Sequence, residues 1–488
     1  MVRLRTLSKY CPVKEMKNMN GLKGLVFLFV LLLASCEVSR LEVRHMLPQS
    51  QGRFIFYMHM NTLTPHDIEF TLSGLELERE DGEWIAILNT PLDISSANLT
   101  DRQIQIEEVI VDPGLYEKVR FHISEATVKG KNGYTNLALP QPDGEYVVAT
   151  TLRVRAKESV VVSLVWSPNQ SVVTGYLFQP SFHIETQRSS PKGLFLFVSN
   201  SGSDYISVID RGVERVIWAI DVEENPRGMV LNPDSEMLYV VNSGSRTISI
   251  VDTALLSLRD TIQLTSGIEP TDIAFLPDIN NLLEGKLYIT DKRSNEVLVV
   301  DTFTRRVEKR LTIGILPSHI ATDPVRREVY VTSEGSNTLS IIDASEDVVT
   351  SVFTVDSRPT GVVVGEDGVL VFSEGSQVVS VVSPSLRRVV RTIPVGIAPK
   401  RGVIGFNKRI FIANSSSNKI TLLNAVETVT SMISVGKYPI NLVTDGDRNR
   451  IYVTNYADGT MTVIDPIREM VAKELFVGKR PYGIVLMN

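Results

Sequence analysis

The segment Tyr452-Val453-Thr454-Asn455, followed by a turn and by Thr460-Met461-Thr462-Val463-Ile464-Asp465, is one copy of a repeat. Six earlier segments have the same character: Phe197-Val198-Ser199-Asn200, Tyr239-Val240-Val241-Asn242, Tyr288-Ile289-Thr290-Asp291, Tyr330-Val331-Thr332-Ser333, Leu370-Val371-Phe372-Ser373 and Phe411-Ile412-Ala413-Asn414. The copies end at residues 200, 242, 291, 333, 373, 414 and 455, so the period is about 42 residues. Two more alternating segments follow most copies, and a proline then opens a short apolar segment, at Pro226, Pro270, Pro317, Pro359, Pro399, Pro439 and Pro481. Each period therefore predicts four short strands.

This period indicates propeller blades rather than a helical solenoid, because the apolar alternation has a period of two throughout. Residues 194–488 resemble the YVTN-type (YncE-like) β-propeller family, and the resemblance implies a seven-bladed propeller with four-stranded blades. The first copy has no proline-led segment before it, whereas the chain ends on such a segment from Pro481 to Leu486. We therefore expect the C-terminal strand to complete the first blade and to close the ring.

Residues 51–187 show alternating apolar segments separated by turns such as Asp81-Gly82 and Asn132-Gly133. This pattern predicts a separate antiparallel β-sandwich, so the fold class is all-β. Gly114-Leu115-Tyr116 and the closing Pro180-Ser181-Phe182 resemble the bacterial family called domain of unknown function 4382, which brings no activity with it. Residues 188–193 contain Ser, Pro and Gly and are expected to form a linker.

The N-terminus has the layout of a secretory signal, predicted over residues 1–35. Its basic segment ends at Lys23, and the apolar run that follows is only about ten residues long, whereas a membrane-spanning helix needs about 20. Leu33-Ala34-Ser35-Cys36 resembles the bacterial lipobox. That resemblance implies cleavage before Cys36 and lipidation of its thiol, with residues 36–50 as a tether. An ordinary signal peptide with an incidental cysteine is the alternative.

The cysteine count agrees with the lipid interpretation. Cys11 and Cys36 are the only two cysteines, so removal of the signal leaves one thiol and no intramolecular disulfide. Several acyl chains on one residue hold a protein stably at a membrane. Glu37 is not the aspartate that retains many lipoproteins at the inner membrane, so by analogy we expect the outer membrane of a bacterial envelope. The side of that membrane is left open.

Composition and motifs argue against several function classes. The 50 Lys and Arg against 56 Asp and Glu give a net charge of -6, so no nucleic-acid partner is expected. The histidines His45, His59, His66, His122, His183 and His319 form no zinc-binding spacing, and neither a Gly-x-Ser-x-Gly elbow nor a Gly-rich phosphate loop is present. We predict no metal, no cofactor and no catalytic residue.

Charged residues cluster beside the proline-led segments, whose loops in a propeller gather around the mouth of the central channel. The set comprises Arg227, Glu269, Asp272, His319, Arg358, Lys400, Arg401, Lys437, Lys479 and Arg480. Seven of these ten are Lys or Arg, so we expect a positive mouth that attracts anions. The candidate ligand-binding residues are Arg227, Asp272, His319, Arg358, Lys400, Arg401 and Arg480. Solvated loop charges without a ligand are the alternative.

Together these features predict a membrane-anchored envelope lipoprotein that acts as a recognition module for an envelope or extracellular protein, peptide or glycan. The competing class is a periplasmic propeller enzyme or cofactor carrier, because relatives of this propeller include sugar lactonases and the haem d1 domain of nitrite reductases. Only His319 lies near the expected mouth, and one histidine does not supply either site. No catalytic residue is carried over from those relatives.

Overall fold

A computed structural model of the chain describes residues 47–62, 64, 66–130, 133–139, 144–187, 193–232 and 234–487. The predicted signal peptide, Cys36 and most of the predicted tether lie outside the described residues, as do residues 188–192 of the predicted linker. Contacts group residues 46–488 into one compact unit. Its regular structure is almost entirely β, which confirms the all-β prediction.

The N-terminal strands form two main sheets, whose order is β12-β9-β1-β5 in the first and β3-β2-β6-β7 in the second, with β4 paired to β2 and β8 paired to β6. The elements are β1 (Gly52–Met60), β2 (Ile68–Arg79), β3 (Trp84–Leu88), β4 (Leu92–Ser95), α2 (Ser96–Leu99), β5 (Arg102–Val111), β6 (Gly114–Gly130), β7 (Gly133–Asn136), β8 (Glu145–Val154), β9 (Ser159–Trp166), β10 (Val172–Val173), β11 (Leu177–Phe178) and β12 (Phe182–Thr186). β10 and β11 form a separate two-stranded pair.

One strand pair departs from the antiparallel prediction. β1 runs antiparallel to β5 but parallel to β9, so the prediction is wrong at that pair. Parallel neighbours need a long connection, and the chain between β1 and β9 supplies it by passing through the second sheet. Alternation of apolar residues marks which face of a strand is buried, but not the direction of its neighbour.

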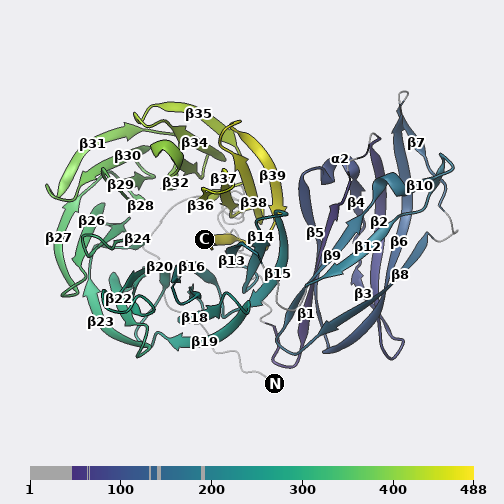
Figure 1. Cartoon of the computed structure of the whole chain (residues 1–488), viewed down its shortest axis with the longest axis horizontal. Coiled ribbons are helices and arrows are strands. Elements are labelled where there is room, and N and C mark those ends of the chain that lie inside the picture. The colour runs from purple at the N-terminus through teal and green to yellow at the C-terminus, as the bar shows by residue number, and fades with distance from the viewer. Residues whose placement is uncertain are drawn as a thin grey trace, which may run out of the picture. The chain divides into compact units, whose positions relative to one another are not determined.

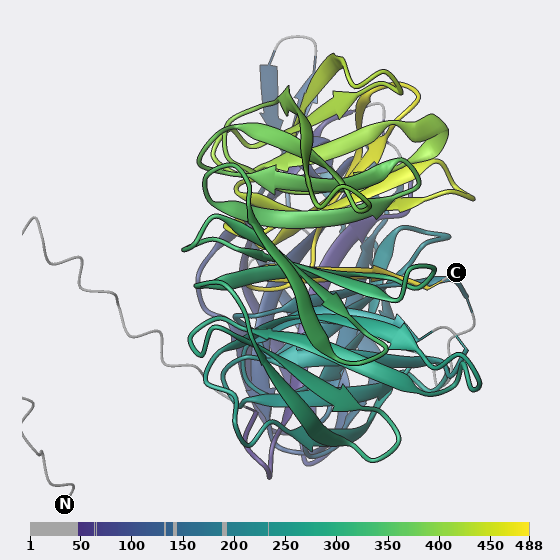
Figure 2. The same cartoon turned by 90° about the vertical axis from the view of Figure 1, so that its left-hand side faces the viewer.

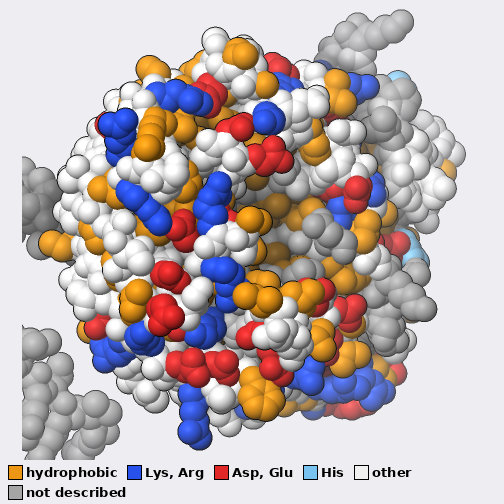
Figure 3. All heavy atoms as spheres, turned by 60° about the vertical axis from the view of Figure 1, so that its left-hand side comes forward, with side chains coloured by type: hydrophobic (Ala, Val, Ile, Leu, Met, Phe, Trp, Pro, Cys, Tyr) orange, Lys and Arg blue, Asp and Glu red, His pale blue; other side chains and the backbone are white. Residues whose placement is uncertain are grey.

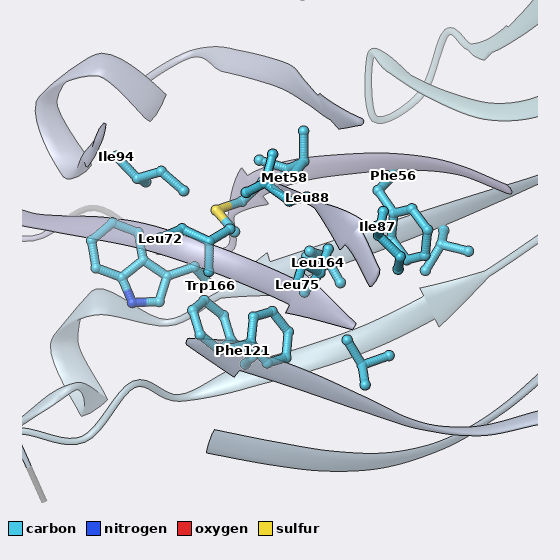
Figure 4. Packing of buried hydrophobic residues seen from close by; sticks show 14 of the residues in the cluster. Phe56, Met58, Leu72, Leu75, Ile87, Leu88, Ile94, Phe121, Leu164 and Trp166 are labelled. Atoms are coloured by element: carbon cyan, nitrogen blue, oxygen red, sulfur yellow. The ribbon is translucent and has the colours of Figure 1, made fainter. Parts of the chain in front are cut away.

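The two N-terminal sheets share one hydrophobic core. Figure 4 shows apolar side chains from both sheets converging, among them Phe56, Met58, Leu72, Leu75, Ile87, Leu88, Ile94, Phe121, Leu164 and Trp166. Along β2 buried and partly exposed residues mostly alternate, because one face of the strand meets this core. The Trp166 indole N–H donates to Ser171 Oγ at 2.9 Å, so the polar atom of the largest core residue is satisfied.

The repeat region consists of antiparallel sheets of four strands each, one of which continues into the first N-terminal sheet (Figure 1). The strands are β13 (Phe195–Asn200), β14 (Tyr205–Asp210) and β15 (Arg215–Asp221) with β40 (Pro481–Leu486); β16 (Pro226–Asn232), β17 (Met237–Asn242), β18 (Thr247–Asp252) and β19 (Ser257–Gln263); β20 (Pro270–Pro277), β21 (Gly285–Asp291), β22 (Glu296–Asp301) and β23 (Arg306–Thr312); β24 (Pro317–Asp323), β25 (Glu328–Ser333), β26 (Thr338–Asp343) and β27 (Val348–Thr354); β28 (Pro359–Gly365), β29 (Gly368–Ser373), β30 (Val378–Ser383) and β31 (Arg388–Pro394); β32 (Pro399–Ile404), β33 (Ile410–Asn414), β34 (Lys419–Leu423) and β35 (Val429–Ser434); and β36 (Pro439–Asp445), β37 (Arg450–Asn455), β38 (Thr460–Asp465) and β39 (Met470–Phe476).

These sheets are arranged in a closed ring. The proline-led strands are innermost and contact one another in the order β16, β20, β24, β28, β32, β36, β40 and again β16. The outer strands β23, β27 and β31, at the left of Figure 1, face the viewer in Figure 2. β40 pairs with β13, so the C-terminal strand completes the sheet of the first three repeat strands.

A buried charge joins the same two ends of the ring. Arg211, which is fully buried after β14, donates from Nε to Asp445 Oδ2 at 2.7 Å. Its Nη1 donates to the carbonyl of Met487, also at 2.7 Å. The start of the repeat region is thereby linked both to β36 and to the residue that follows β40.

The recurring asparagine at the end of the repeat motif has a structural role. In four copies its side-chain amide donates to a hydroxyl on the next strand, at 2.7 to 2.9 Å: Asn200 to Ser207, Asn242 to Ser249, Asn414 to Thr421 and Asn455 to Thr462. All four asparagines are fully buried. A buried amide N–H needs an acceptor, so this hydrogen bond helps to fix the register between the motif strand and the next one.

The N-terminal sheets and the repeat region are joined by backbone pairing. β39 runs parallel to β5, with Glu474 opposite Arg102 and Leu475 opposite Gln103. The Gln103 side chain accepts from the Val216 N–H at 2.8 Å and donates to its carbonyl at 3.3 Å. The Gln103 side chain therefore satisfies the backbone N–H and carbonyl of Val216 at the edge of β15, as a neighbouring strand would.

Candidate functional site

A cavity of about 480 Å³, called the mouth cavity below, lies where the inner strands begin. Its wall comprises Arg227, Lys292, Ser318, Glu334, Thr360, Lys400, Arg401, Tyr438, Ile440, Tyr456, Ala457 and Tyr482. Six of these residues directly follow the proline that opens an inner strand: Arg227, Ser318, Thr360, Lys400, Ile440 and Tyr482. One position of the repeat therefore supplies half of the wall. The volume of the cavity suits a small-molecule ligand or the end of a larger ligand.

The backbone before each proline explains how other wall residues are placed. Six of the seven preceding residues have a left-handed φ between +53° and +57°: Asn225, Leu316, Arg358, Ala398, Tyr438 and Arg480. That conformation costs a non-glycine residue about 1–2 kcal/mol. It is held by a repeated hydrogen bond in which the carbonyl before the proline accepts from the residue after the motif strand. The Tyr438 carbonyl accepts from the Tyr456 N–H at 3.0 Å and the Leu316 carbonyl from the Glu334 N–H at 2.9 Å, so Tyr456 and Glu334 are both fixed from the backbone.

Below the mouth cavity a buried ion pair crosses the ring. Asp272 on β20 is 4% exposed, and its Oδ2 accepts from Arg401 Nη2 on β32 at 3.1 Å. His319 on β24 places Nε2 at 3.3 Å from the same oxygen. Burial raises the pKa of Asp272, while the guanidinium of Arg401 acts in the opposite direction. These three side chains form a floor, in which Asp272 and His319 come from the neighbouring strands β20 and β24 and Arg401 reaches them from β32, which is a neighbour of neither.

His319 is engaged at both ring nitrogens. Its Nδ1 accepts from the Val362 N–H at 2.9 Å, so the proton of the neutral ring lies on Nε2 and points to Asp272. Burial lowers the pKa of His319 well below its usual value, and Arg401 lowers it further. The imidazole is therefore neutral and holds the floor together, and it does not line the mouth cavity.

The wall carries more positive than negative side chains. Its four cations are Arg227, Lys292, Lys400 and Arg401, and its one carboxylate is Glu334. Acidic partners lie nearby: Arg227 contacts Glu269 at 3.4 Å, Lys292 contacts Glu334 at 3.5 Å, and Lys400 contacts Glu374 at 2.7 Å. Glu269 and Glu374 are outside the wall, so the surface that faces a ligand is net positive. Figure 3 shows one face of the molecule, on which Lys and Arg are interspersed with Asp and Glu.

Three tyrosines complete the wall. The rings of Tyr438 and Tyr456 lie 6.1 Å apart, and the guanidinium of Arg401 lies 5.4 Å from the ring centre of Tyr482. The second contact places a cation over an aromatic face, an arrangement that orients both groups. The sequence prediction considered only charged residues and missed the tyrosines, although Tyr438 and Tyr482 stand directly beside Pro439 and Pro481.

The seven candidate residues fall into three groups. Arg227, Lys400 and Arg401 line the mouth cavity, and Asp272 and His319 lie in the floor. Arg358 and Arg480 are not part of the wall. The Arg358 side chain is 57% exposed and contacts Glu374 at 3.1 Å, while the Arg480 carbonyl accepts from the Ser201 N–H at 3.0 Å. That any of the seven binds a ligand stays a prediction.

Within the part of the chain that the structure describes, no group of three or more His, Cys, Asp or Glu side chains is arranged to hold a metal ion. In the same residues no helix combines the length and the apolar character needed to cross a membrane.

A ring of repeated four-stranded sheets with a cavity at the ends of its inner strands defines a β-propeller-like protein. The chain belongs to the YNCE-like beta-propeller family, whose sequence model matches residues 180–488. This match confirms the YncE-like resemblance seen in the repeats.

Three individual relatives that match this chain share less than 30% sequence identity with it. Antigen Lp49 of Leptospira interrogans is 27% identical over 187 residues, which is 35% of this chain and 41% of the antigen, so the match spans less than half of that relative. A functionally unknown protein from Desulfotomaculum acetoxidans is 11% identical with a TM-score of 0.53, and the match covers 60% of this chain and 98% of that protein. Hydrazine synthase of Kuenenia stuttgartiensis is 18% identical with a TM-score of 0.48, over 58% and 97% of the two chains. The likeness to the Desulfotomaculum protein shows the fold alone.

Proposed function

We propose that the protein is a lipid-anchored envelope protein that binds an anionic ligand in the mouth cavity. The observation that carries this proposal is a positive, tyrosine-containing wall, in which Arg401 is held in place by the buried carboxylate of Asp272. Carboxylate groups of a peptide, protein or acidic glycan match such a wall, because Arg and Lys bind carboxylates and tyrosine faces pack against peptide or sugar carbons.

The proposal includes the domain organisation. We interpret the repeated sheets as seven blades of a propeller over residues 194–488, with β36–β39 as one blade and β40 as the innermost strand of the first. The two sheets that share the N-terminal core are interpreted as the predicted sandwich over residues 51–187. A rigid scaffold of this kind suits recognition, because its loops present a preformed surface.

Anchoring through Cys36 is tested independently of ligand binding. The full chain and a Cys36→Ser variant are expressed in a bacterium with two membranes and supplied with radioactive palmitate. We expect label and outer-membrane recovery for the parent chain, and neither for the variant. An unlabelled parent chain released with soluble proteins would contradict the anchor and leave the mouth cavity proposal intact.

Ligand binding is tested by capturing the full chain from mildly solubilised envelopes and identifying retained molecules by mass spectrometry. The test variant combines Arg227→Gln with Lys400→Gln, which removes two wall cations and leaves the floor pair intact. Arg358→Gln is the matched control, because Arg358 and Lys400 contact the same carboxylate, Glu374, but only Lys400 lines the cavity.

An anionic molecule that is retained by the parent chain and by Arg358→Gln, but is lost from the double variant, would support the mouth cavity as the binding site. Equal recovery with all three forms would contradict that site and point to another surface. A parent chain that retains nothing above background would count against a recognition role.

A further inference from the structure

A second, smaller cavity lies where β1 and β5 meet β15 and β39, and we call it the seam cavity. Its volume is about 190 Å³, and its wall includes His59, Asp101, Arg102, Arg215 and Lys473. These residues come from the N-terminal sheets and from two outer strands of the repeat region. The cavity is therefore separate from the mouth cavity, with which it shares no residue.

His59 is the unusual member of this wall. It is 3% exposed, and among the described residues neither Nδ1 nor Nε2 has a hydrogen-bond partner. A buried polar atom without a partner costs roughly 1–3 kcal/mol, so buried nitrogens are normally satisfied by protein, water or a ligand. Burial lowers the pKa of His59 to about 3, with Arg215 and Lys473 as further causes. The ring thus has a free N–H donor and lies near two cations.

The two cations are also poorly compensated. The Arg215 guanidinium has no hydrogen bond or ion pair with a described residue, and the Lys473 ammonium donates to the Val213 carbonyl at 3.0 Å. Burial lowers the pKa of both groups. Opposing charge is present but limited: Asp101 is in the wall, Glu185 and Glu214 act from nearby, and Arg102 lies 3.9 Å from Glu474. Within the wall itself, the three cations Arg102, Arg215 and Lys473 outnumber the single carboxylate of Asp101.

We propose that the seam cavity binds a small tetrahedral oxyanion, as phosphate or as the phosphate group of a larger molecule. Such an anion accepts from the His59 ring N–H, from the guanidinium of Arg215 and from the ammonium of Lys473 at once. It supplies the missing partner of a buried nitrogen and neutralises two partly buried cations. It also binds residues of β1, β15 and β39 together, so its occupancy strengthens the contact between the N-terminal sheets and the repeat region.

The test uses the full chain, with sodium phosphate as the probe and sodium chloride at equal ionic strength as the reference. Binding is measured by isothermal titration calorimetry at pH 7, and thermal unfolding reports stabilisation. We expect phosphate to bind and to raise the unfolding midpoint. Lys473→Gln and Arg215→Gln should each weaken binding by about tenfold or more, because each removes a charged hydrogen bond.

Two further variants serve as controls. The first tests whether phosphate binds in the mouth cavity instead, and the second tests whether weaker binding results from impaired folding. Lys400→Gln removes a cation from the mouth cavity and should leave phosphate binding unchanged. His59→Leu removes both unpartnered nitrogens, so it should weaken phosphate binding without lowering the unfolding midpoint in chloride. This variant keeps the proposal testable if loss of a cation impairs folding.

Phosphate binding that survives both Lys473→Gln and Arg215→Gln would overturn the proposal, as would the absence of any phosphate effect beyond chloride. Loss of binding in Lys400→Gln alone would move the anion to the mouth cavity and would also overturn it. Glycerol 3-phosphate distinguishes between the two forms of the anion, free phosphate and the phosphate group of a larger molecule. Tighter binding of glycerol 3-phosphate than of inorganic phosphate supports the phosphate group of a larger molecule, and weaker binding supports free phosphate.

Discussion

Replacing Arg211 with leucine should strongly destabilise the ring. Arg211 and Asp445 are both fully buried, and the guanidinium also donates to the Met487 carbonyl. Removing one partner of a buried ion pair leaves the other charge without compensation, which costs about 3–5 kcal/mol. One hydrogen bond from the Arg448 N–H to Asp445, at 3.2 Å, remains and does not replace the lost charge. We therefore expect Arg211→Leu to lower the free energy of unfolding by about 3–5 kcal/mol.

The measurement is urea unfolding followed by far-ultraviolet circular dichroism and by tryptophan fluorescence, which reports on Trp218 in β15 as well as on the N-terminal sheets. The control is Arg391→Leu. Arg391 pairs with Glu427, but its side chain is 54% exposed, so its loss should cost less than about 1 kcal/mol. The double replacement of Arg211 and Asp445 by leucine should cost less than Arg211→Leu alone, because no unpaired charge stays behind. If Arg211→Leu and Arg391→Leu lowered the free energy of unfolding equally, water would be compensating the charge of Asp445, and the prediction would be refuted.

Two other predictions concern pH and the chain end. In chloride buffer, acidification from pH 7 to 5 should remove about 2 kcal/mol of stability through His59, and His59→Leu should flatten this part of a pH series of urea titrations. The sign follows from the pKa, which is about 3 in the folded chain against an ordinary 6.5, so the unfolded chain binds more protons as pH falls and the stabilisation is lost from about 6.5 downward. Deleting residues 481–488 should expose the inner edge of β13, which β40 otherwise pairs. The truncated chain should then unfold at lower temperature and be cut faster by protease near β13, and unchanged melting would count against closure by β40.

The repeat architecture was predictable from local sequence patterns. Nearly every strand of the ring pairs with a neighbour close in sequence, so period, turn residues and the leading proline were enough to predict four strands per copy. The pairing of β40 with β13 spans almost the whole repeat region, yet it follows from counting: the first copy is one strand short and the last has one too many. The hydrogen bonds of the buried asparagines give a physical reason for the amide that ends four of the seven copies.

Features that depend on distant contacts were not predictable in this way. Asp272 and Arg401 stood among the candidates as mouth charges, but their pairing across the ring requires the closed geometry. The seam cavity has no local signature, because His59, Arg215 and Lys473 come from three separate parts of the sequence. The parallel neighbour of β1 likewise depends on where a strand about a hundred residues later returns.

Pairing of β40 with β13 also has a consequence for biosynthesis. Because β13, an early strand of the repeat region, pairs with β40, the ring cannot close until β40 has been synthesised. A nascent chain can form single blades as they emerge, but it retains an open first blade with an unsatisfied inner edge. Chains that stop early keep that edge, and proteases and chaperones recognise such surfaces. The order of the strands therefore makes synthesis of β40 a condition for reaching the closed form.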